Sequence, residues 1–207
     1  WNENWKVHFK PFRLGRHVVV RPVWEKADSG PEDIELVITP KMAFGTGHHE
    51  TTRLILRLLE EYDLENKKVL DAGTGSGILA IYAARRGAAG VVAFDIDPEA
   101  MENARENGAL NGVPDKIHWF TGVLNDAPRK AYDVIVANIN RNVLLELAGE
   151  MAHFAGPESR LILSGLLLTD EEKVLQAYMK NGWKFNGRKE EGEWAALELI
   201  RQNGEEK

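Results

Sequence analysis

Short apolar runs alternate with longer segments of mixed polarity through most of this 207-residue chain. Short runs bounded by turn residues are typical of buried strands, and apolar residues spaced three or four positions apart are typical of helices. Strands are expected on this basis at 69–70, 91–94, 117–120, 132–137, 160–164, 183–185 and 194–200. Helices are expected at 54–62, opened by Thr51 or Thr52, and at 78–86, 98–110, 141–154 and 169–181.

The order of these elements predicts an α/β fold. Five strand–helix units followed by a hairpin predict a seven-stranded, mostly parallel sheet, with an antiparallel C-terminal hairpin and helices on both faces. Ligands of such sheets bind at the carboxyl ends of the strands, near the point where the strand order reverses. We therefore expect the functional residues to follow the strands directly.

The segment before this alternation reads differently. Residues 1–45 are expected to form an N-terminal linker segment with short strands at 18–20 and 34–38, separated by a loop rich in Pro, Gly and acidic residues. Residues 46–201 are expected to form the ligand-binding domain, and 202–207 a disordered tail.

The most informative stretch is the glycine turn after the strand at 69–70. Gly73, Gly75 and Gly77 alternate with other residues, and Ile78 stands where a dinucleotide site would have its third glycine. A phosphate-binding P-loop would need Lys-Ser or Lys-Thr, which is absent. Asp95 follows about 20 residues later, where such folds place the acid that binds a ribose. The pattern favours an adenosyl ligand without a pyrophosphate; the alternative is a glycine-rich turn in another kind of α/β protein.

Three polar features fall at strand ends of the predicted sheet. The glycine turn follows the first strand, Asp95 the second and Asn138 the fourth. Because these ends share one edge of a parallel sheet, we expect them to converge on one site. The alternative for Asn138 is an ordinary turn residue at a strand end.

Composition and charge exclude several classes of function. A net charge of −6 argues against direct nucleic-acid specificity, although an acidic protein can attract a basic protein partner. With no cysteine, disulfides and thiolate chemistry are excluded. No apolar run approaches the roughly 18 residues that a membrane span needs, so no membrane association and a cytoplasmic location are expected.

A metal site is not expected at the His48-His49-Glu50 run. Adjacent loop histidines point in different directions, and the HExxH pattern fails because position 53 is Arg. We expect this run to shape a pocket wall together with Phe44 and the neighbouring threonine hydroxyls.

Several motifs resemble one family of enzymes. DAGTGSG is similar to the first motif of the class I S-adenosylmethionine-dependent methyltransferases, which have a Rossmann-like fold. More narrowly, MAFGTGHHETT, LDAGTGSGILAI, FDIDPEA, VANI and FKPFRLGRHVVVRP resemble the PrmA family, which methylates ribosomal protein L11. The resemblance covers nearly all of the chain, and the FGTG-H-x-TT loop makes it specific. It implies a catalytic domain at 46–201 that binds S-adenosylmethionine, without the family's N-terminal substrate-recognition domain.

The resemblance also implies which residues hold the cofactor. Thr52 would contact it, with Thr46 close by, and Gly73 and Gly75 would lie against its methionine portion and the ribose edge. Asp95 would accept hydrogen bonds from both ribose hydroxyls.

Two further roles come with the same resemblance. Ile96 would pack against adenine, and Asn138 would be the catalytic residue beside the sulfonium and the incoming amine.

Two further acidic residues stand next to these positions. Asp71 is expected either to order the glycine turn or to screen the sulfonium charge, and Asp97, before Pro98, is expected to cap a helix.

The acceptor is expected to be an alkyl amine. Asn138-Ile139-Asn140 has neither the ring nor the prolines of the NPPY-type motif that stacks planar acceptors, so nucleic-acid bases are disfavoured. The leading hypothesis is a monomeric enzyme that methylates lysine side-chain or N-terminal α-amines of ribosomal protein L11. The alternatives are a related protein lysine methyltransferase with a different protein target and a cofactor-binding module without turnover.

Overall fold

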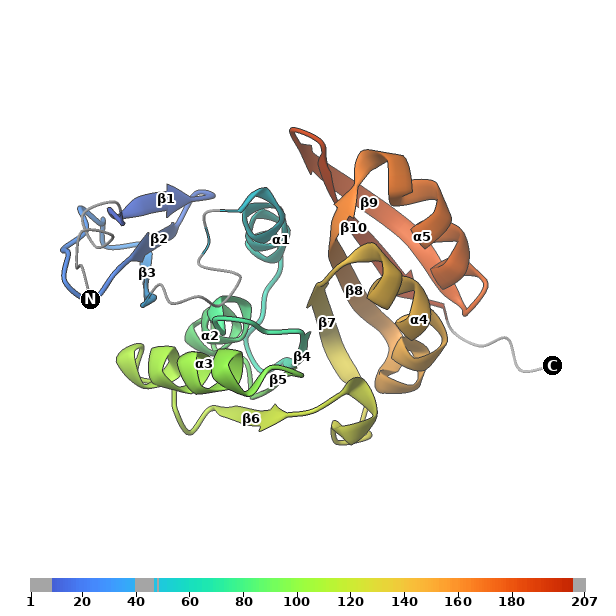
Figure 1. Cartoon of the computed structure of the whole chain (residues 1–207), viewed down its shortest axis with the longest axis horizontal. Coiled ribbons are helices and arrows are strands. Elements are labelled where there is room, and N and C mark those ends of the chain that lie inside the picture. Colours follow the sequence, from blue (N-terminus) through green and yellow to red (C-terminus); the bar gives the residue numbers. More distant parts are fainter. Residues whose placement is uncertain (1–8, 40–46, 48, 203–207) are drawn as a thin grey trace.

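A seven-stranded sheet forms the centre of the protein (Figure 1). The computed structural model describes residues 9–39, 47 and 49–202. The strands follow the order β6-β5-β4-β7-β8-β10-β9. Their bounds are β4 Lys68–Ala72, β5 Gly90–Asp95, β6 Ile117–Thr121, β7 Tyr132–Asn138, β8 Ala155–Leu167, β9 Trp183–Glu191 and β10 Trp194–Arg201.

The first five of these strands are parallel, and β10 runs antiparallel to both β8 and β9. The prediction of a mostly parallel seven-stranded sheet with an antiparallel C-terminal hairpin is therefore confirmed. The chain builds outward from β4 to β5 and β6, and then returns to the other side of β4 with β7. The strand order thus reverses between β4 and β7.

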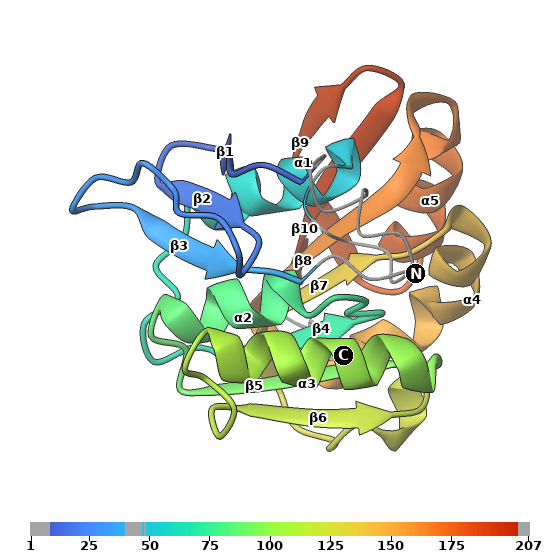
Figure 2. The same ribbon diagram turned by 60° about the vertical axis from the view of Figure 1, so that its left-hand side comes forward.

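Helices cover both faces of the sheet (Figures 1 and 2). One face carries α1 (Glu50–Leu59), α2 (Ile78–Arg85) and α3 (Pro98–Leu110), and the other carries α4 (Arg141–Met151) and α5 (Glu171–Met179). Single 3₁₀ turns lie at η2 (Leu124–Asp126), η3 (Ala152–Phe154) and η4 (Leu168–Asp170).

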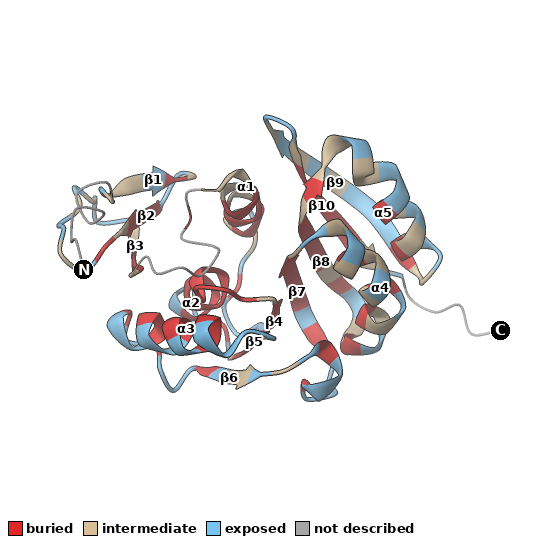
Figure 3. Ribbon diagram, in the orientation of Figure 1, coloured by how far each residue is buried: buried red, intermediate tan, exposed pale blue. Residues whose placement is uncertain are grey.

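Successive side chains of each central strand pack on opposite faces of the sheet. Val69 and Val91 pack with α1 and α2, while Leu70 and Val92 pack in the second core cluster with α4 and α5. Successive side chains of a strand alternate in direction, so a strand that is covered on both faces is apolar at nearly every position. This is why the central strands β4 and β7 are buried at most of their positions (Figure 3) and why their sequences are largely apolar.

A small second sheet packs on the side of α1 and α2. It consists of β1 (Phe12–Leu14), β2 (Val18–Arg21) and β3 (Ile34–Val37), with β2 antiparallel to β1 and parallel to β3. Its apolar side chains, Leu14 and Leu36 among them, belong to the same core cluster as α1 and α2.

The C-terminal end of α3 also holds this small sheet. Asn111 donates from Nδ2 to the carbonyl oxygen of Val37 at 2.7 Å and accepts from its backbone N–H at 2.8 Å. Asp97 caps the other end of α3 by accepting from the backbone N–H of Glu99 at 2.9 Å, as expected. The predicted division between residues 45 and 46 falls outside the described residues, as do residues 203–207 of the tail predicted at 202–207, so both stay predictions.

Some element bounds differ from the expectation. The first helix starts at Glu50 rather than 54, because His49 caps it with its ring nitrogen. Strand β9 extends to Glu191, well beyond residue 185, because its exposed charged residues belong to an edge strand paired with β10. The three-residue strand β1 was not predicted, since so short a run carries no periodic signal.

Candidate active site

A cavity of about 620 Å³ opens at the carboxyl ends of the parallel strands. It lies where the strand order reverses between β4 and β7, and its volume is typical of a small-molecule site. The half next to β4 and β5 is lined by Ala72, Gly73, Gly75, Phe94, Asp95, Ile96, Val123 and Leu124. The other half is lined by His49, Thr51, Asn138, Ile139, Asn140, Val143, Glu146, Leu147, Gly165 and Trp194.

The glycine turn forms the floor between the two halves. The backbone N–H groups of Gly73 and Thr74 both donate to the carbonyl oxygen of Phe94 at 2.9 Å, so the turn folds back over β5. Gly73 has a φ of +71°, which favours glycine, and a Cβ atom there would collide with Cγ2 of Ile139. Only glycine allows this approach of β4 to the end of β7.

The carboxylate of Asp95 is fixed by two backbone donors. Its Oδ2 accepts from the N–H of Gly75 at 3.0 Å, and its Oδ1 accepts from the N–H of Asp97 at 3.1 Å. Each carboxylate oxygen can accept a further hydrogen bond, so the group can bind two neighbouring hydroxyls. Beside it, Ile96 is 73% exposed, which offers an apolar surface at the cavity for a planar ring.

Asp71 lies below the glycine turn and is fully buried. Its Oδ2 accepts from the hydroxyl of Thr74 at 2.6 Å and from the N–H of Ala80 at 3.1 Å, which ties β4 to the turn and to α2. Burial raises the pKa of Asp71 to about 7, and the charge of Asp95 acts in the same direction. Its Oδ1 has no hydrogen-bond partner in the described part of the chain. The contacts favour the ordering of the turn as one role of this residue.

Asn138 ends β7 at the other side of the cavity and is 9% exposed. Its Nδ2 donates to the hydroxyl of Thr52 at 3.2 Å. Its Oδ1 is buried and, among the described residues, meets no donor. An unpaired buried acceptor costs about 1–3 kcal/mol, so such atoms in native proteins call for a partner that the chain itself does not supply.

The structure thus brings Gly73, Gly75, Asp95, Ile96 and Asn138 together around one cavity. Their individual roles stay predictions. Thr52 is fully buried and reaches the site through its bond to Asn138, whereas Thr51 lines the cavity. Thr46 and Phe44 lie outside the described residues.

Two lining residues come from distant parts of the chain. His49 lines the cavity, as expected for a pocket wall, and its ring packs edge-on against Trp194 with centroids 4.8 Å apart. Trp194 was not singled out from the sequence, because six tryptophans carry no local signal that separates one from another. Among the described residues, no group of three His, Cys, Asp or Glu side chains is placed to bind a metal ion.

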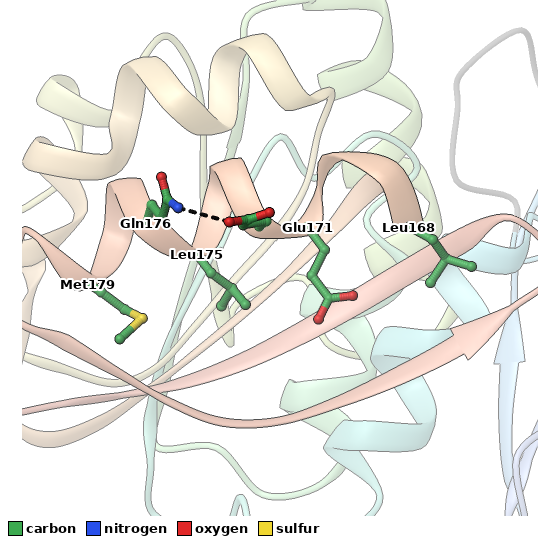
Figure 4. Close-up of a pocket in the computed structure, with 6 residues that line it drawn as sticks. Leu168, Glu171, Leu175, Gln176 and Met179 are labelled. Carbon is green, nitrogen blue, oxygen red and sulfur yellow. Dashed lines mark hydrogen bonds between the residues drawn. The ribbon is translucent and has the colours of Figure 1, made fainter.

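A second hollow lies on the outer surface of α5 (Figure 4). It is lined by Leu168, Glu171, Glu172, Leu175, Gln176 and Met179. Gln176 donates to Glu172 at 3.2 Å and Glu171 accepts from Arg188 at 2.6 Å, so its polar groups are already engaged. The strand-end cavity, which is lined by Asn138 with its unpartnered buried oxygen, is the better candidate for chemistry.

No helix in the described part of the chain combines the length and the apolar character that crossing a bilayer requires.

Comparison with known proteins gives a consistent result. Residues 1–202 match the family model described as ribosomal protein L11 methyltransferase (PrmA). The chain is 45% identical over 202 residues to the ribosomal protein L11 methyltransferase of Pelobacter propionicus, covering 95% of this chain and 65% of the relative. It is 44% identical over 204 residues to that of Geobacter sulfurreducens, covering 99% of this chain and 67% of the relative.

A solved structure is similar over most of the chain as well. The ribosomal protein L11 methylase of Lactobacillus delbrueckii subsp. bulgaricus matches with a TM-score of 0.87 and 33% identity, over 94% of this chain and 100% of that one. The Rossmann-like methyltransferase fold is thereby confirmed. The chain spans about two thirds of the length of the curated relatives that it matches.

Proposed function

The chain belongs to the family of ribosomal protein L11 methyltransferases (PrmA), and from that premise we propose that it transfers methyl groups from S-adenosylmethionine to amines of ribosomal protein L11. The observation that carries the proposal is the cavity at the strand reversal, which is lined both by a carboxylate fit for a ribose and by an amide whose buried oxygen has no donor among the described residues. The proposed acceptors are lysine side-chain amines and the N-terminal α-amine of that protein.

The half of the cavity next to β4 and β5 fits the adenosyl group. Asp95 keeps an acceptor site on each oxygen for the ribose hydroxyls, and Ile96 presents an exposed apolar side chain for adenine. Gly73 and Gly75 keep the floor open, because neither has a side chain at the closest approach. Thr46 and Thr52 complete the proposed cofactor contacts. When bound, the cofactor supplies a methyl group on a positively charged sulfur.

Asn138 is the proposed catalytic residue. Its Nδ2 is held by Thr52, so its Oδ1 is left to accept an N–H of the acceptor amine and to orient the nitrogen lone pair. Orienting two reacting groups at close range is the main contribution that a protein makes to a displacement reaction. A positive charge beside the amine also lowers the pKa of that amine.

The amine has to lose a proton before it reacts. A free lysine has a pKa near 10.4, so deprotonation at pH 7 costs about 4–5 kcal/mol. The apolar wall of the cavity, with Val143 and Leu147, reduces this cost by disfavouring the charged form. The proposed route for the proton is release to solvent, since Asp95 is engaged by two backbone donors and Glu146 is exposed.

The remaining parts of the proposal concern organisation. Residues 1–45 would act as the linker segment and 46–201 as the methyltransferase domain, working as a monomer. A ribosomal protein as substrate implies that the reaction takes place in the cytoplasm.

Transfer of labelled methyl groups tests the function directly. The protein is incubated with radiolabelled S-adenosylmethionine and purified ribosomal protein L11, alone and within a mixture of ribosomal proteins. Label on L11 that depends on Asn138 supports the proposal. Label on a different protein indicates a related lysine methyltransferase, and cofactor binding without any label indicates a binding module without turnover.

A further inference from the structure

One carboxylate connects the β9–β10 hairpin to α1. Glu191, the last residue of β9, accepts with Oε1 from Nε and Nη2 of Arg53 at 2.9 and 2.6 Å. Its Oε2 accepts from Nη1 of Arg57 at 2.9 Å. Because Arg53 and Arg57 lie one turn apart on α1, both oxygens of Glu191 are used to bridge the helix and the hairpin.

The same two segments meet inside the cavity. Trp194, the first residue of β10, is the partner of Glu191 in the antiparallel ladder. It is the one described residue of β9 or β10 that lines the cavity. Its ring contacts that of His49 with an interplanar angle of 70°, and His49 caps α1 one turn before Arg53. The ring pair of His49 and Trp194 inside the cavity and the ion pairs of Glu191 outside it therefore both join α1 to the β9–β10 hairpin.

We propose that Glu191 is a positioning residue for the acceptor end of the cavity: by binding Arg53 and Arg57, it holds the Trp194 ring against His49 where an alkyl amine enters. The inference rests on the proposed amine methylation. The face of a tryptophan attracts alkylammonium groups, so the placement of this ring affects how the acceptor binds. A misplacement of about 1 Å in a site can reduce the rate about 100-fold.

The bridge is remote from the adenosyl half of the cavity. Asp95 and the glycine turn belong to β4 and β5, at the other side of the strand reversal, and no described hydrogen bond of Glu191 reaches them. Loss of the bridge should therefore reduce the use of the protein acceptor and leave cofactor affinity unchanged.

The chain offers a matched control. Lys189 and Glu61 form a second ion pair, at 2.6 Å, between the same hairpin and the segment that follows α1, away from the cavity. Glu191→Gln and Glu61→Gln each remove one carboxylate charge from an ion pair of the hairpin, the first with α1 and the second with the segment that follows it. Partly exposed ion pairs add little to stability, so both variants should fold.

The first experiment compares these variants in kcat/KM for L11 and in affinity for S-adenosylhomocysteine by calorimetry. Glu191→Gln is expected to lower kcat/KM about tenfold or more and to keep the Kd within about twofold, while Glu61→Gln changes neither. Equal effects of the two substitutions, or a parallel loss of cofactor affinity, would overturn the inference.

A double-mutant cycle tests whether Glu191 acts through Trp194. In a Trp194→Ala background, Glu191→Gln should lower kcat/KM by no more than about twofold, because the ring that it positions is gone. If instead the factors by which the two substitutions lower kcat/KM multiply in the double variant, Glu191 acts independently of Trp194 and the inference is wrong.

A third measurement does not depend on turnover. The indole N–H signal of Trp194, assigned by its absence in Trp194→Phe, is recorded by NMR for the wild type and both variants. It should shift in Glu191→Gln and stay in place in Glu61→Gln. If the wild type methylates no amine, the proposed function fails, but the NMR signal still tests whether Glu191 positions the Trp194 ring. An indole signal that does not shift in Glu191→Gln excludes this positioning role.

Discussion

The side-chain amide of Asn138 donates to the hydroxyl of Thr52 at 3.2 Å and so joins the end of β7 to the first turn of α1 across 86 positions of sequence. Both residues are buried. The bond uses the amide nitrogen, which leaves the carbonyl oxygen of Asn138 as an acceptor without a donor in the described part of the chain. The orientation of this amide therefore defines what the acceptor half of the cavity can bind.

Replacing Asn138 by Ala should reduce turnover much more than cofactor affinity. The amine nitrogen gains positive charge as the methyl group is transferred, and a hydrogen bond from a group that is becoming charged contributes about 1.5–3 kcal/mol, which corresponds to roughly a 10- to 100-fold loss in kcat. The Kd for S-adenosylhomocysteine should stay within a few-fold, as measured by calorimetry beside single-turnover kinetics. Similar losses in kcat and in affinity would contradict the role given to Asn138. Thr52→Val, which keeps the shape and removes the acceptor, should lower kcat by a smaller factor.

Asp95→Asn should weaken binding of S-adenosylhomocysteine about 100-fold, because the two proposed ribose bonds lose their charged acceptor. Asp97→Asn is the matched control. It changes the next carboxylate but keeps the cap of α3, since Asn caps helices as well as Asp does. Calorimetry on both variants checks the prediction. Unchanged affinity in Asp95→Asn, or binding of a nicotinamide dinucleotide by the wild type, would refute an adenosyl site at this position.

The site residues at the strand ends could be predicted from the sequence. The contribution of the β9–β10 hairpin to the cavity wall, Trp194, could not. Gly73, Asp95 and Asn138 each lie at or directly after the end of a strand, so a parallel sheet brings them to one edge whatever the details of packing. Trp194 reaches the cavity only because β10 inserts between β8 and β9, with Trp194 paired to Leu167. The choice of strand partners depends on long-range packing, which leaves no local pattern around a single tryptophan.

The length of α1 illustrates the same limit. Apolar periodicity placed the helix at 54–62, whereas it begins at Glu50 because the ring nitrogen of His49 accepts from the N–H of Thr51. Threonine is preferred at helix N-caps and histidine is not, so the sequence indicates Thr51 or Thr52 as the opening residue and not His49. The earlier start makes Thr52 part of the helix, where its hydroxyl accepts the hydrogen bond from Asn138.

Burial of Asp71 should make stability fall as the pH rises. The pKa of its carboxyl is about 7 in the folded protein and about 3.9 in an unfolded chain. Between these values the folded state holds a proton that the unfolded state has released, so the free energy of unfolding decreases with rising pH. The loss begins near pH 4 and is complete above pH 7, at up to about 4 kcal/mol.

Asp71→Asn should remove this dependence. Both hydrogen bonds of Asp71 end on Oδ2, so the single oxygen of an amide can accept both of them. Urea unfolding at pH 4, 6 and 8 should show the variant and the wild type nearly equal at the lowest pH and the variant more stable at the highest. Parallel profiles would mean that Asp71 is ionised in the folded state throughout. If Asp71→Asn loses affinity for S-adenosylmethionine but not for S-adenosylhomocysteine, Asp71 also has the second of its two expected roles, which is to screen the sulfonium charge.

Gly73→Ala should destabilise the protein and close the floor of the cavity. Gly73 has a φ of +71° and Gly112 a φ of +69°, so Ala at either position incurs a similar backbone strain of about 1–2 kcal/mol. A Cβ at Gly112 meets nothing within 4 Å, whereas one at Gly73 collides with Cγ2 of Ile139. Overpacking of this kind costs about 1–3 kcal/mol more, which is the expected difference between the two variants in free energy of unfolding.

The same pair of variants tests the site. Gly112→Ala should leave the Kd for S-adenosylhomocysteine unchanged, because its surroundings are open and distant from the cavity lining. Gly73→Ala should weaken binding at least tenfold, or about 1.4 kcal/mol, since Ile139 has to move into the space beside the glycine turn. Ile139→Ala in the Gly73→Ala background removes the colliding methyl group and should recover part of the lost stability. If the double variant is no more stable than Gly73→Ala, contact with Ile139 is not the reason for glycine at this position.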